Sequence, residues 1–257
     1  MTQKIEFKNT LDEKLAGALH QPEQYAGDLC VIVCHGFTGN KDKNWIKNAC
    51  DRISKEVSVP AFRFDFAGNG ESEGTFAQAH YLKEVGDLKS AIDLLETKGF
   101  KKFITIGHSM GSVVCQVEAA EDARVIRVID VSGTGDTKRF VTERFEKGEW
   151  GMPDAPYKHT KRDGRVFFVS QEFIDAGLKI DLPEIVKKLK IPALFIHGDA
   201  DESVLYSEGQ KLFSFYGGPK EFVTIAGANH SFTDPDRERQ MIDAIIQWLK
   251  TAVNNRP

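Results

Sequence analysis

Short apolar runs alternate with amphipathic stretches along most of this chain. Runs without polar breaks are typical of strands covered on both faces of a parallel sheet, and residues 29–34 form one. In the stretches between the runs, apolar residues recur at helical spacing. The predicted strands are 4–8, 14–20, 29–34, 60–66, 102–106, 125–131, 193–196 and 221–225. The predicted helices are 40–56, 81–97, the stretch after 111, 207–216 and 234–252.

This order predicts an α/β fold with a mostly parallel, eight-stranded sheet flanked by helices, because strands that alternate with helices are joined by crossover connections. The first two strands are close in sequence and predict an antiparallel hairpin at the sheet edge. Asp234 and Pro235 are the residue types expected at the N-cap and first turn of the last helix. Gly99 is expected to end the helix at 81–97.

The alternation stops between residues 134 and 190, after the sixth strand. This stretch is rich in aromatic and charged residues and contains no run of the central-strand type. We therefore predict a hydrolase-like core formed by 1–133 and 191–257, and a small cap of helices and a hairpin formed by 134–190.

Composition narrows the choice of partner and compartment. The chain has 257 residues, is 41% hydrophobic and carries a net charge of −4 without a basic block, which disfavours a nucleic-acid partner. The run at 29–33 is too short to span a bilayer, and the first residues show no apolar signal segment. The four cysteines lack metal-finger spacing and suit reduced core residues. We expect a cytoplasmic protein without a membrane span; its oligomeric state stays open, with a homodimer among the alternatives.

The segment Gly107-His108-Ser109-Met110-Gly111 carries the strongest chemical signal. It follows a predicted strand and precedes a predicted helix, which is the context of a nucleophile elbow. The turn is so sharp that the flanking positions have no room for side chains, and it projects the Ser109 hydroxyl above the sheet. Ser109 is the candidate nucleophile.

An elbow serine needs a base, since a free hydroxyl is a poor nucleophile at neutral pH. In this context the triad follows the chain order Ser, acid, His. Three histidines lie downstream, of which His159 falls in the predicted cap and His197 ends a strand. His230 lies in a loop after the last strand and is the candidate base.

The acid is expected after the penultimate strand, in the sequence 197–204. Asp201 is the first choice and Asp199 a close competitor that suits a loop-stabilising role. Glu202 and Asp130 are more distant alternatives. The acid would hold the base in the correct tautomer and stabilise its imidazolium form.

Two backbone N–H groups are expected to stabilise the tetrahedral oxyanion. Met110 follows the nucleophile and supplies one of them, and Phe37 in the loop after the third strand supplies the other. Gly36 allows this loop to approach the substrate closely. His35 is interpreted as a loop-bracing residue rather than a base.

These motifs resemble the α/β-hydrolase family across essentially the whole chain. His35-Gly36-Phe37 is similar to the family's oxyanion loop, the stretch 65–72 to its D-x-x-G-x-G-x-S turn, and 198–201 to its acid loop, which places the acid at Asp201. The stretch 35–41, the 65–72 turn and the length of the cap further resemble the cinnamoyl and feruloyl esterase-like branch.

The resemblance implies a serine carboxylesterase that hydrolyses small or medium carboxylic esters, with hydroxycinnamoyl esters among the candidates. The expected mechanism uses no cofactor and no metal. A thioesterase, acyltransferase or peptidase could use the same three residues, and a non-catalytic binding protein is the alternative from another class. The aromatic residues Trp150, Phe167 and Phe168 are candidate substrate contacts in the cap, although such residues also pack as the core of an insertion.

Overall fold

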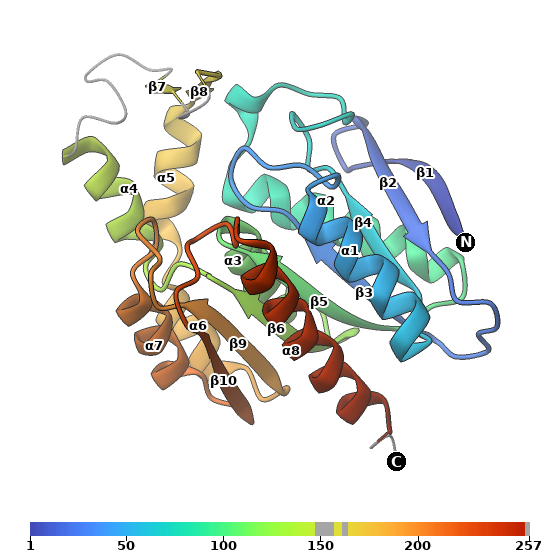
Figure 1. Ribbon diagram of the computed structural model, residues 1–257. Helices are drawn as coiled ribbons and strands as arrows, with labels where there is room; N and C mark the ends of the chain where they lie inside the picture. Colours follow the sequence, from blue (N-terminus) through green and yellow to red (C-terminus); the bar gives the residue numbers. More distant parts are fainter. Residues whose placement is uncertain (147–156, 161–163, 255–257) are drawn as a thin grey trace.

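The computed structural model describes residues 1–146, 157–160 and 164–254. Figure 1 shows one twisted sheet with helices on both faces and a group of elements, α4, α5, β7 and β8, at one end. The strands of the main sheet are β1 (Thr2–Lys8), β2 (Lys14–His20), β3 (Leu29–Cys34), β4 (Ala61–Phe64), β5 (Lys102–His108), β6 (Val125–Val131), β9 (Ala193–Gly198) and β10 (Lys220–Ile225).

The main sheet has eight strands in the order β1-β2-β4-β3-β5-β6-β9-β10. Every pairing from β4 to β10 is parallel, whereas β2 pairs antiparallel with β1 and with β4. The predicted α/β class, the mostly parallel sheet and the N-terminal hairpin are therefore confirmed.

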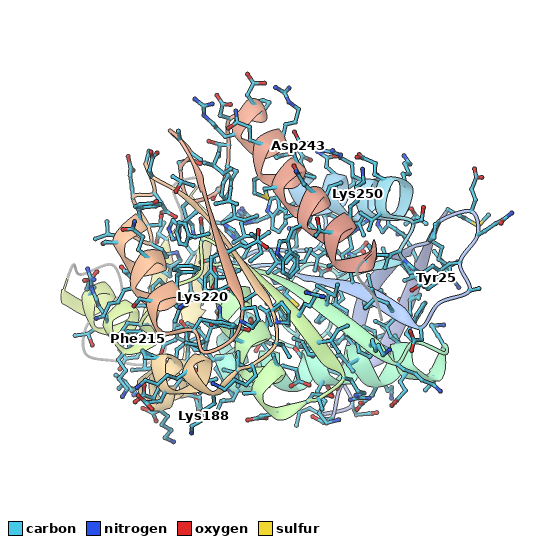
Figure 2. All side chains as sticks on the ribbon, turned by 90° about the horizontal axis from the view of Figure 1, so that it is seen from below. Tyr25, Lys188, Phe215, Lys220, Asp243 and Lys250 are labelled. Atoms are coloured by element: carbon cyan, nitrogen blue, oxygen red, sulfur yellow. The ribbon has the colours of Figure 1, made fainter. Side chains whose placement is uncertain are left out.

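The helices lie in two layers, which Figure 2 shows from below, with α8 on one side of the sheet. The helical elements are α1 (Asn44–Arg52), a π-helical turn (Ile53–Val57), a short 3-10 turn (Phe76–Gln78), α2 (Tyr81–Thr97), α3 (Met110–Glu121), α4 (Thr137–Glu146), α5 (Gln171–Lys179), α6 (Leu182–Lys188), α7 (Tyr206–Phe215) and α8 (Pro235–Asn254). One buried cluster joins α1 and α8 to the sheet, and a second joins α2, α3, α6 and α7 to its other face.

Strand β3 shows why its sequence has no polar break. Cys30, Ile32 and Cys34 belong to the cluster beneath α2 and α3, whereas Leu29, Val31 and Val33 belong to the cluster beneath α1 and α8. Alternate side chains of a strand point to opposite faces. Because both faces are covered by helices, every position of the strand must be apolar.

Helix boundaries follow the predicted signals at α2 and α8. The Asp234 side chain accepts hydrogen bonds from the N–H groups of Asp236 and Arg237, at 2.9 and 3.1 Å, and Pro235 is the first helical residue. Gly99 follows α2 with φ +96°, a conformation that side chains disfavour. Both ends are confirmed.

Helix α1 begins later than the predicted start at residue 40. Asp65 removes the preceding residues from the helix, because its carboxylate accepts the backbone N–H of Lys41 at 2.6 Å and the Lys41 ammonium at 2.9 Å. The same carboxylate accepts the N–H of Glu71 at 2.9 Å, so it organises the 65–72 turn. A Cβ at Gly70 would overlap it. This turn is structural, as the sequence indicated.

Between β6 and β9 the chain forms α4, the antiparallel hairpin of β7 (Tyr157–Thr160) and β8 (Val166–Val169), α5 and α6. Helix α4 packs on α5, and the hairpin contacts the 3-10 turn that precedes α2. Helix α6 packs on α3 and α7. The assignment of 134–190 to a separate cap stays a prediction.

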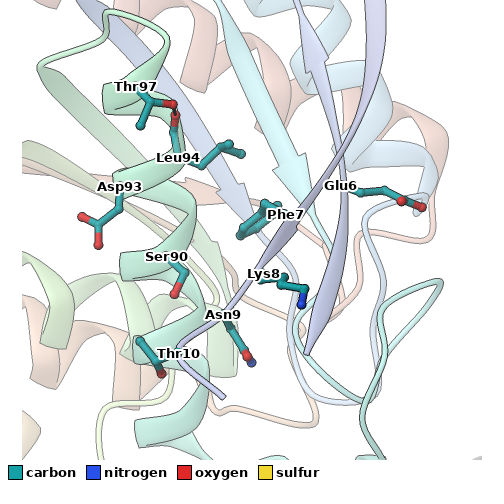
Figure 3. A pocket seen from close by; sticks show the side chains of 9 residues that line it. All are labelled: Glu6, Phe7, Lys8, Asn9, Thr10, Ser90, Asp93, Leu94 and Thr97. Carbon is teal, nitrogen blue, oxygen red and sulfur yellow. Dashed lines mark hydrogen bonds between the residues drawn. The ribbon is translucent and has the colours of Figure 1, made fainter. Parts of the chain in front are cut away.

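A shallow depression of about 530 Å³ lies between β1 and α2 (Figure 3). Its lining includes Phe7, Ser90 and Leu94 and none of the candidate site residues. None of the helices in the described ranges combines the length and the apolar character needed to cross a bilayer.

Glu118 on α3 makes the stability of the fold pH-dependent. Burial raises the pKa of its carboxyl from the usual 4.5 to about 7, and the nearby Asp122 adds to this effect. Because the folded state favours the protonated form, the ionisation of Glu118 destabilises it progressively from about pH 4.5 to about pH 7, and fully above that range.

We therefore expect Glu118→Gln to stabilise the protein at pH 8 by on the order of 2 kcal/mol and to change little at pH 4.5. Thermal melts at both pH values measure this difference. Glu121→Gln, at an exposed position on the same helix, is the matched control and should be neutral at both. An equal effect of Glu118→Gln at the two pH values would contradict the assignment.

Candidate active site

Ser109 lies at a sharp turn between β5 and α3. Its backbone has φ 55° and ψ −119°, a strained conformation for a residue with a side chain. A Cβ at Gly107 would overlap the carbonyl of Gly111, and a Cβ at Gly111 would overlap the carbonyl of His35. The strand–turn–helix geometry expected of a nucleophile elbow is therefore present, and the glycines are there because the turn has no room for side chains.

His230, in the loop between β10 and α8, lies beside this serine. Its Nε2 atom is 3.0 Å from the Ser109 hydroxyl oxygen, and its Nδ1 atom is 2.8 Å from Oδ2 of Asp201. An ionised carboxylate can only accept, so the Nδ1 atom donates, and in the neutral ring the Nε2 lone pair faces the hydroxyl. This is the arrangement in which imidazole can take a proton from serine.

Asp201 is the acid that the fold brings to His230. Its side chain is fully buried, and its Oδ1 atom accepts the backbone N–H groups of Ser203 and Val204 at 2.8 and 2.9 Å. Burial by itself would raise the pKa of this carboxyl. Hydrogen bonds from His197 and His230 outweigh burial and hold the pKa well below its usual range. Asp201 therefore stays ionised at neutral pH.

The competing acids have other partners. Asp199 accepts the backbone N–H of Gly227 at 2.6 Å, which is the loop-stabilising role expected for it. Asp130 is buried on β6 and accepts hydrogen bonds from the Gln116 amide at 2.6 Å and from the Gly133 N–H at 2.8 Å. Glu202 is exposed. Among these carboxylates, Asp201 is the one with a hydrogen bond to His230.

The loop after β3 lies against the elbow. A Cβ at Gly36 would be 2.8 Å from the carbonyl oxygen of His108 and 3.1 Å from Cβ of Ser109. The ring of His35 braces this loop: Nδ1 lies 2.9 Å from the Gly36 carbonyl oxygen and Nε2 accepts the Phe66 N–H at 3.2 Å. Burial lowers the pKa of His35 to about 4, so its ring is neutral. Phe37 follows in this loop, and Met110 begins α3 with a helix N-terminus at its N–H.

Aromatic side chains connect the hairpin β7–β8 to this loop. The Phe37 ring lies 5.2 Å from Phe76, 5.4 Å from His159 and 5.3 Å from Phe173 between centroids. Phe167 in turn lies 4.8 Å from Phe76. We call Phe37, Phe76, His159, Phe167 and Phe173 the aromatic cluster.

The other two cap candidates lie elsewhere. Phe168 is adjacent to Phe167 on β8, so it points to the opposite face of the hairpin, and it is 48% exposed. Trp150 lies outside the described residues. Of the three aromatic candidates, Phe167 is the one that the structure joins to the oxyanion loop.

Two contacts at the site were not predicted from the sequence. The Nε2 atom of His108, next to the nucleophile, donates to the carbonyl oxygen of His230 at 2.8 Å and ties the base loop to β5. His197 lies 3.3 Å from Oδ2 of Asp201 through its Nε2 atom. Their positions, one beside the nucleophile and one before the acid loop, were the only sequence signals. In the described part of the chain, no three His, Cys, Asp or Glu side chains gather as a metal site.

Comparison with known proteins agrees with this fold. Residues 30–148 match the model of the alpha/beta hydrolase fold family. The uncharacterized protein YfhR from Salmonella typhi is 26% identical over 240 residues, which cover 87% of this chain and 72% of the relative. YfhR from Escherichia coli K12 is 25% identical over 230 residues, with 85% and 70% covered.

Solved esterases superpose over almost the whole chain. Est1E from Butyrivibrio proteoclasticus, in a structure with ferulic acid bound, has a TM-score of 0.79 and 23% identity and covers 97% of both chains. The esterase domain of a Rhodothermus marinus protein has a TM-score of 0.77 and 21% identity and covers 98% of both. At this identity the likeness concerns the fold. The chain is therefore an α/β-hydrolase-fold protein, with esterases among its structural neighbours.

Proposed function

We propose that this protein is a serine carboxylesterase in which Ser109 is the nucleophile, His230 the base and Asp201 the orienting acid. The observation that carries the proposal is the continuous hydrogen-bonded series from the Ser109 hydroxyl through His230 to Asp201, with spacings of 3.0 and 2.8 Å, at a strained elbow. A surface histidine paired with a carboxylate would not require a serine at φ 55° beside it.

The reaction follows from these positions. The Ser109 oxygen attacks the ester carbonyl while its proton moves to Nε2 of His230. The tetrahedral intermediate expels the alcohol, which takes that proton, and leaves an acyl group on Ser109. Water then attacks the acyl group by the same route in reverse and releases the acid and the free serine. Asp201 stays ionised and stabilises the imidazolium form of His230.

The oxyanion of the intermediate needs two N–H donors that are already in place before the reaction. We assign them to Met110, at the start of α3, and Phe37, in the braced loop beside the elbow. Gly36 supports this assignment, because its lack of a side chain lets the loop lie against the backbone of His108 and the Cβ of Ser109.

For the acyl group we propose a small or medium carboxylic acid, with hydroxycinnamoyl acids among the candidates. The aromatic cluster beside Phe37 supports an apolar or aromatic acyl group, and the neighbour Est1E binds ferulic acid. A cytoplasmic location and a cap over the site complete the proposal. Thioesters, amides and transfer to acceptors other than water use the same three residues, so substrate assays must separate them.

A panel of substrates tests the function. We expect hydrolysis of p-nitrophenyl acetate, butyrate or octanoate, or of methyl ferulate, by the wild-type protein and none by Ser109→Ala. An added alcohol that diverts most of the acyl group would indicate an acyltransferase, and activity on thioesters or p-nitroanilides alone would indicate a thioesterase or peptidase. A folded protein inactive on all of them would contradict catalysis of acyl transfer.

The aromatic cluster gives a separate prediction about selectivity. Phe167→Ala removes a ring contact with Phe76, and since such pairs contribute about 0.5–1.5 kcal/mol, we expect the KM or the ratio of aryl to alkyl esters to change about threefold to tenfold. Phe168→Ala is the matched control, and we expect it to stay within about twofold. Equal kinetics for both variants and the wild type would remove the cluster from the substrate site.

A further inference from the structure

We propose that His197 is a positioning residue for the acid: it donates a second hydrogen bond to the carboxylate oxygen of Asp201 that holds His230. This inference rests on the proposed function. In it, Oδ2 of Asp201 is shared between two imidazoles, and His197 sets both the orientation of the carboxylate and the negative potential that it presents to the base.

The protonation of His197 follows from its neighbours. Its Nε2 atom lies 3.0 Å from the carbonyl oxygen of Val204 and 3.3 Å from Oδ2 of Asp201. Both oxygens can only accept, so Nε2 carries a hydrogen whether the ring is neutral or charged. The longer of the two contacts is the branch that reaches the acid. His197 is therefore a donor to Asp201 in either state.

The ring of His197 is held in place by two elements. It is 1% exposed at the end of β9, and the Tyr206 ring of α7 lies edge-on to it, 5.9 Å between centroids. A Cβ at Gly209 would overlap its Nδ1 atom. Glycine inside a helix is destabilising, and its presence in α7 leaves the space that this ring occupies.

With His197 included, the acceptor capacity of the Asp201 carboxylate is filled. Oδ1 accepts two backbone N–H groups, from Ser203 and Val204, and Oδ2 accepts His230 and His197. An ionised carboxylate offers about four lone-pair sites. A carboxylate bound on all sides cannot rotate, so the contact with His230 keeps one geometry through the reaction.

The other charged and titratable groups around the pair are few. Asp130 on β6 and Asp201 act on His197, and Tyr206 on α7 lies against it. Burial lowers the pKa of His197, but the hydrogen bonds to Asp201 and to the Val204 carbonyl outweigh burial and raise it above its usual value. His230 faces Asp201 on one side and the His108 ring of β5 on the other, at 4.9 Å between centroids. Lys43 acts on His108.

A donor on Oδ2 has a definite effect on catalysis. It takes up part of the negative potential that would otherwise stabilise the imidazolium form of His230. Without His197 the carboxylate would favour that protonated form more strongly and would also be free to rotate. The protonated base cannot accept a proton from Ser109, so activity should fall at the acidic end of the pH profile.

The test compares His197→Leu, which removes the donor, with His197→Gln, whose amide can place a donor near the position of Nε2. For His197→Leu we expect kcat on an active ester to fall about 10-fold, KM to stay within about twofold, and the acidic limb of kcat/KM to move up by about half a pH unit. His197→Gln should restore most of kcat and the wild-type limb. Melting curves establish that both variants are folded.

Two results would overturn the proposal. One is a His197→Leu variant with the wild-type kcat and pH profile. The other is an equal loss in both variants without a shift of the limb, which would indicate a packing role. If no ester is hydrolysed by the wild type, the proposed function fails, and the contact itself is tested by ¹⁵N-histidine NMR on the full chain. The His197 Nε2–H resonance should move upfield in Asp201→Asn, and an unmoved resonance would also overturn the proposal.

Discussion

Replacing Ser109 by alanine should reduce ester turnover by roughly 10³- to 10⁶-fold, to the level that substrate binding alone sustains. The reason is that the hydroxyl is the atom that forms the acyl-enzyme. The backbone strain at φ 55° is unchanged, because alanine also carries a Cβ. We therefore expect melting behaviour close to that of the wild type, and kcat/KM on an active ester measures the loss.

The controls for this prediction use the same assay. Ser214→Ala alters an exposed hydroxyl that donates to the carbonyl of Lys211, and it should leave turnover within about twofold. His230→Ala should cost about as much as Ser109→Ala, and the double variant little more, because the two residues act as one unit. Additive losses, or substantial activity in Ser109→Ala, would mean that another residue is the nucleophile.

Asp201→Asn should lower kcat by about 10⁴-fold, whereas Asp199→Asn should stay within about threefold. The amide of asparagine can turn its NH₂ group toward Nδ1 of His230, which then favours the wrong tautomer of the base. Asp199 accepts one backbone N–H, from Gly227, and an asparagine oxygen can still accept it. Both changes preserve shape, so a difference between them reports the role of the acid. Kinetics at one pH with both purified variants measures it.

Asp130→Asn extends this comparison to the third carboxylate. Its partners are Gln116 and Gly133, and we expect the melting temperature to respond more than kcat. A loss in Asp199→Asn or Asp130→Asn equal to that in Asp201→Asn would contradict the assignment of the acid.

The elements that the sequence predicted well are those whose signal is local. Strand β3 is apolar at every position because two helical layers cover it, and Asp234 and Pro235 mark the start of α8 by capping chemistry that acts over a few residues. The elbow is equally local, because its glycines are required by contacts within the turn and with the neighbouring strand. The order of Ser109, Asp201 and His230 along the chain then named three side chains that the fold brings together.

Long-range contacts decided what local patterns could not predict. Helix α1 begins at residue 44 because Asp65, in another strand–loop segment, binds the N–H of Lys41. The link from His197 to Asp201 depends on a close approach of α7 to β9, for which Gly209 leaves space. Phe167 and Phe168 looked equivalent as adjacent aromatic residues, and only the pairing of β7 with β8 assigns them to opposite faces.

The most direct test of the account is the site of covalent labelling by an organophosphorus ester such as diisopropyl fluorophosphate. The account predicts one adduct per chain by intact mass, located by peptide mapping on the peptide that contains Ser109, with parallel loss of ester hydrolysis. The adduct should be absent in Ser109→Ala and strongly slowed in His230→Ala. An adduct on another residue, or the same labelling in Ser109→Ala, would contradict the assignment of Ser109 as the nucleophile.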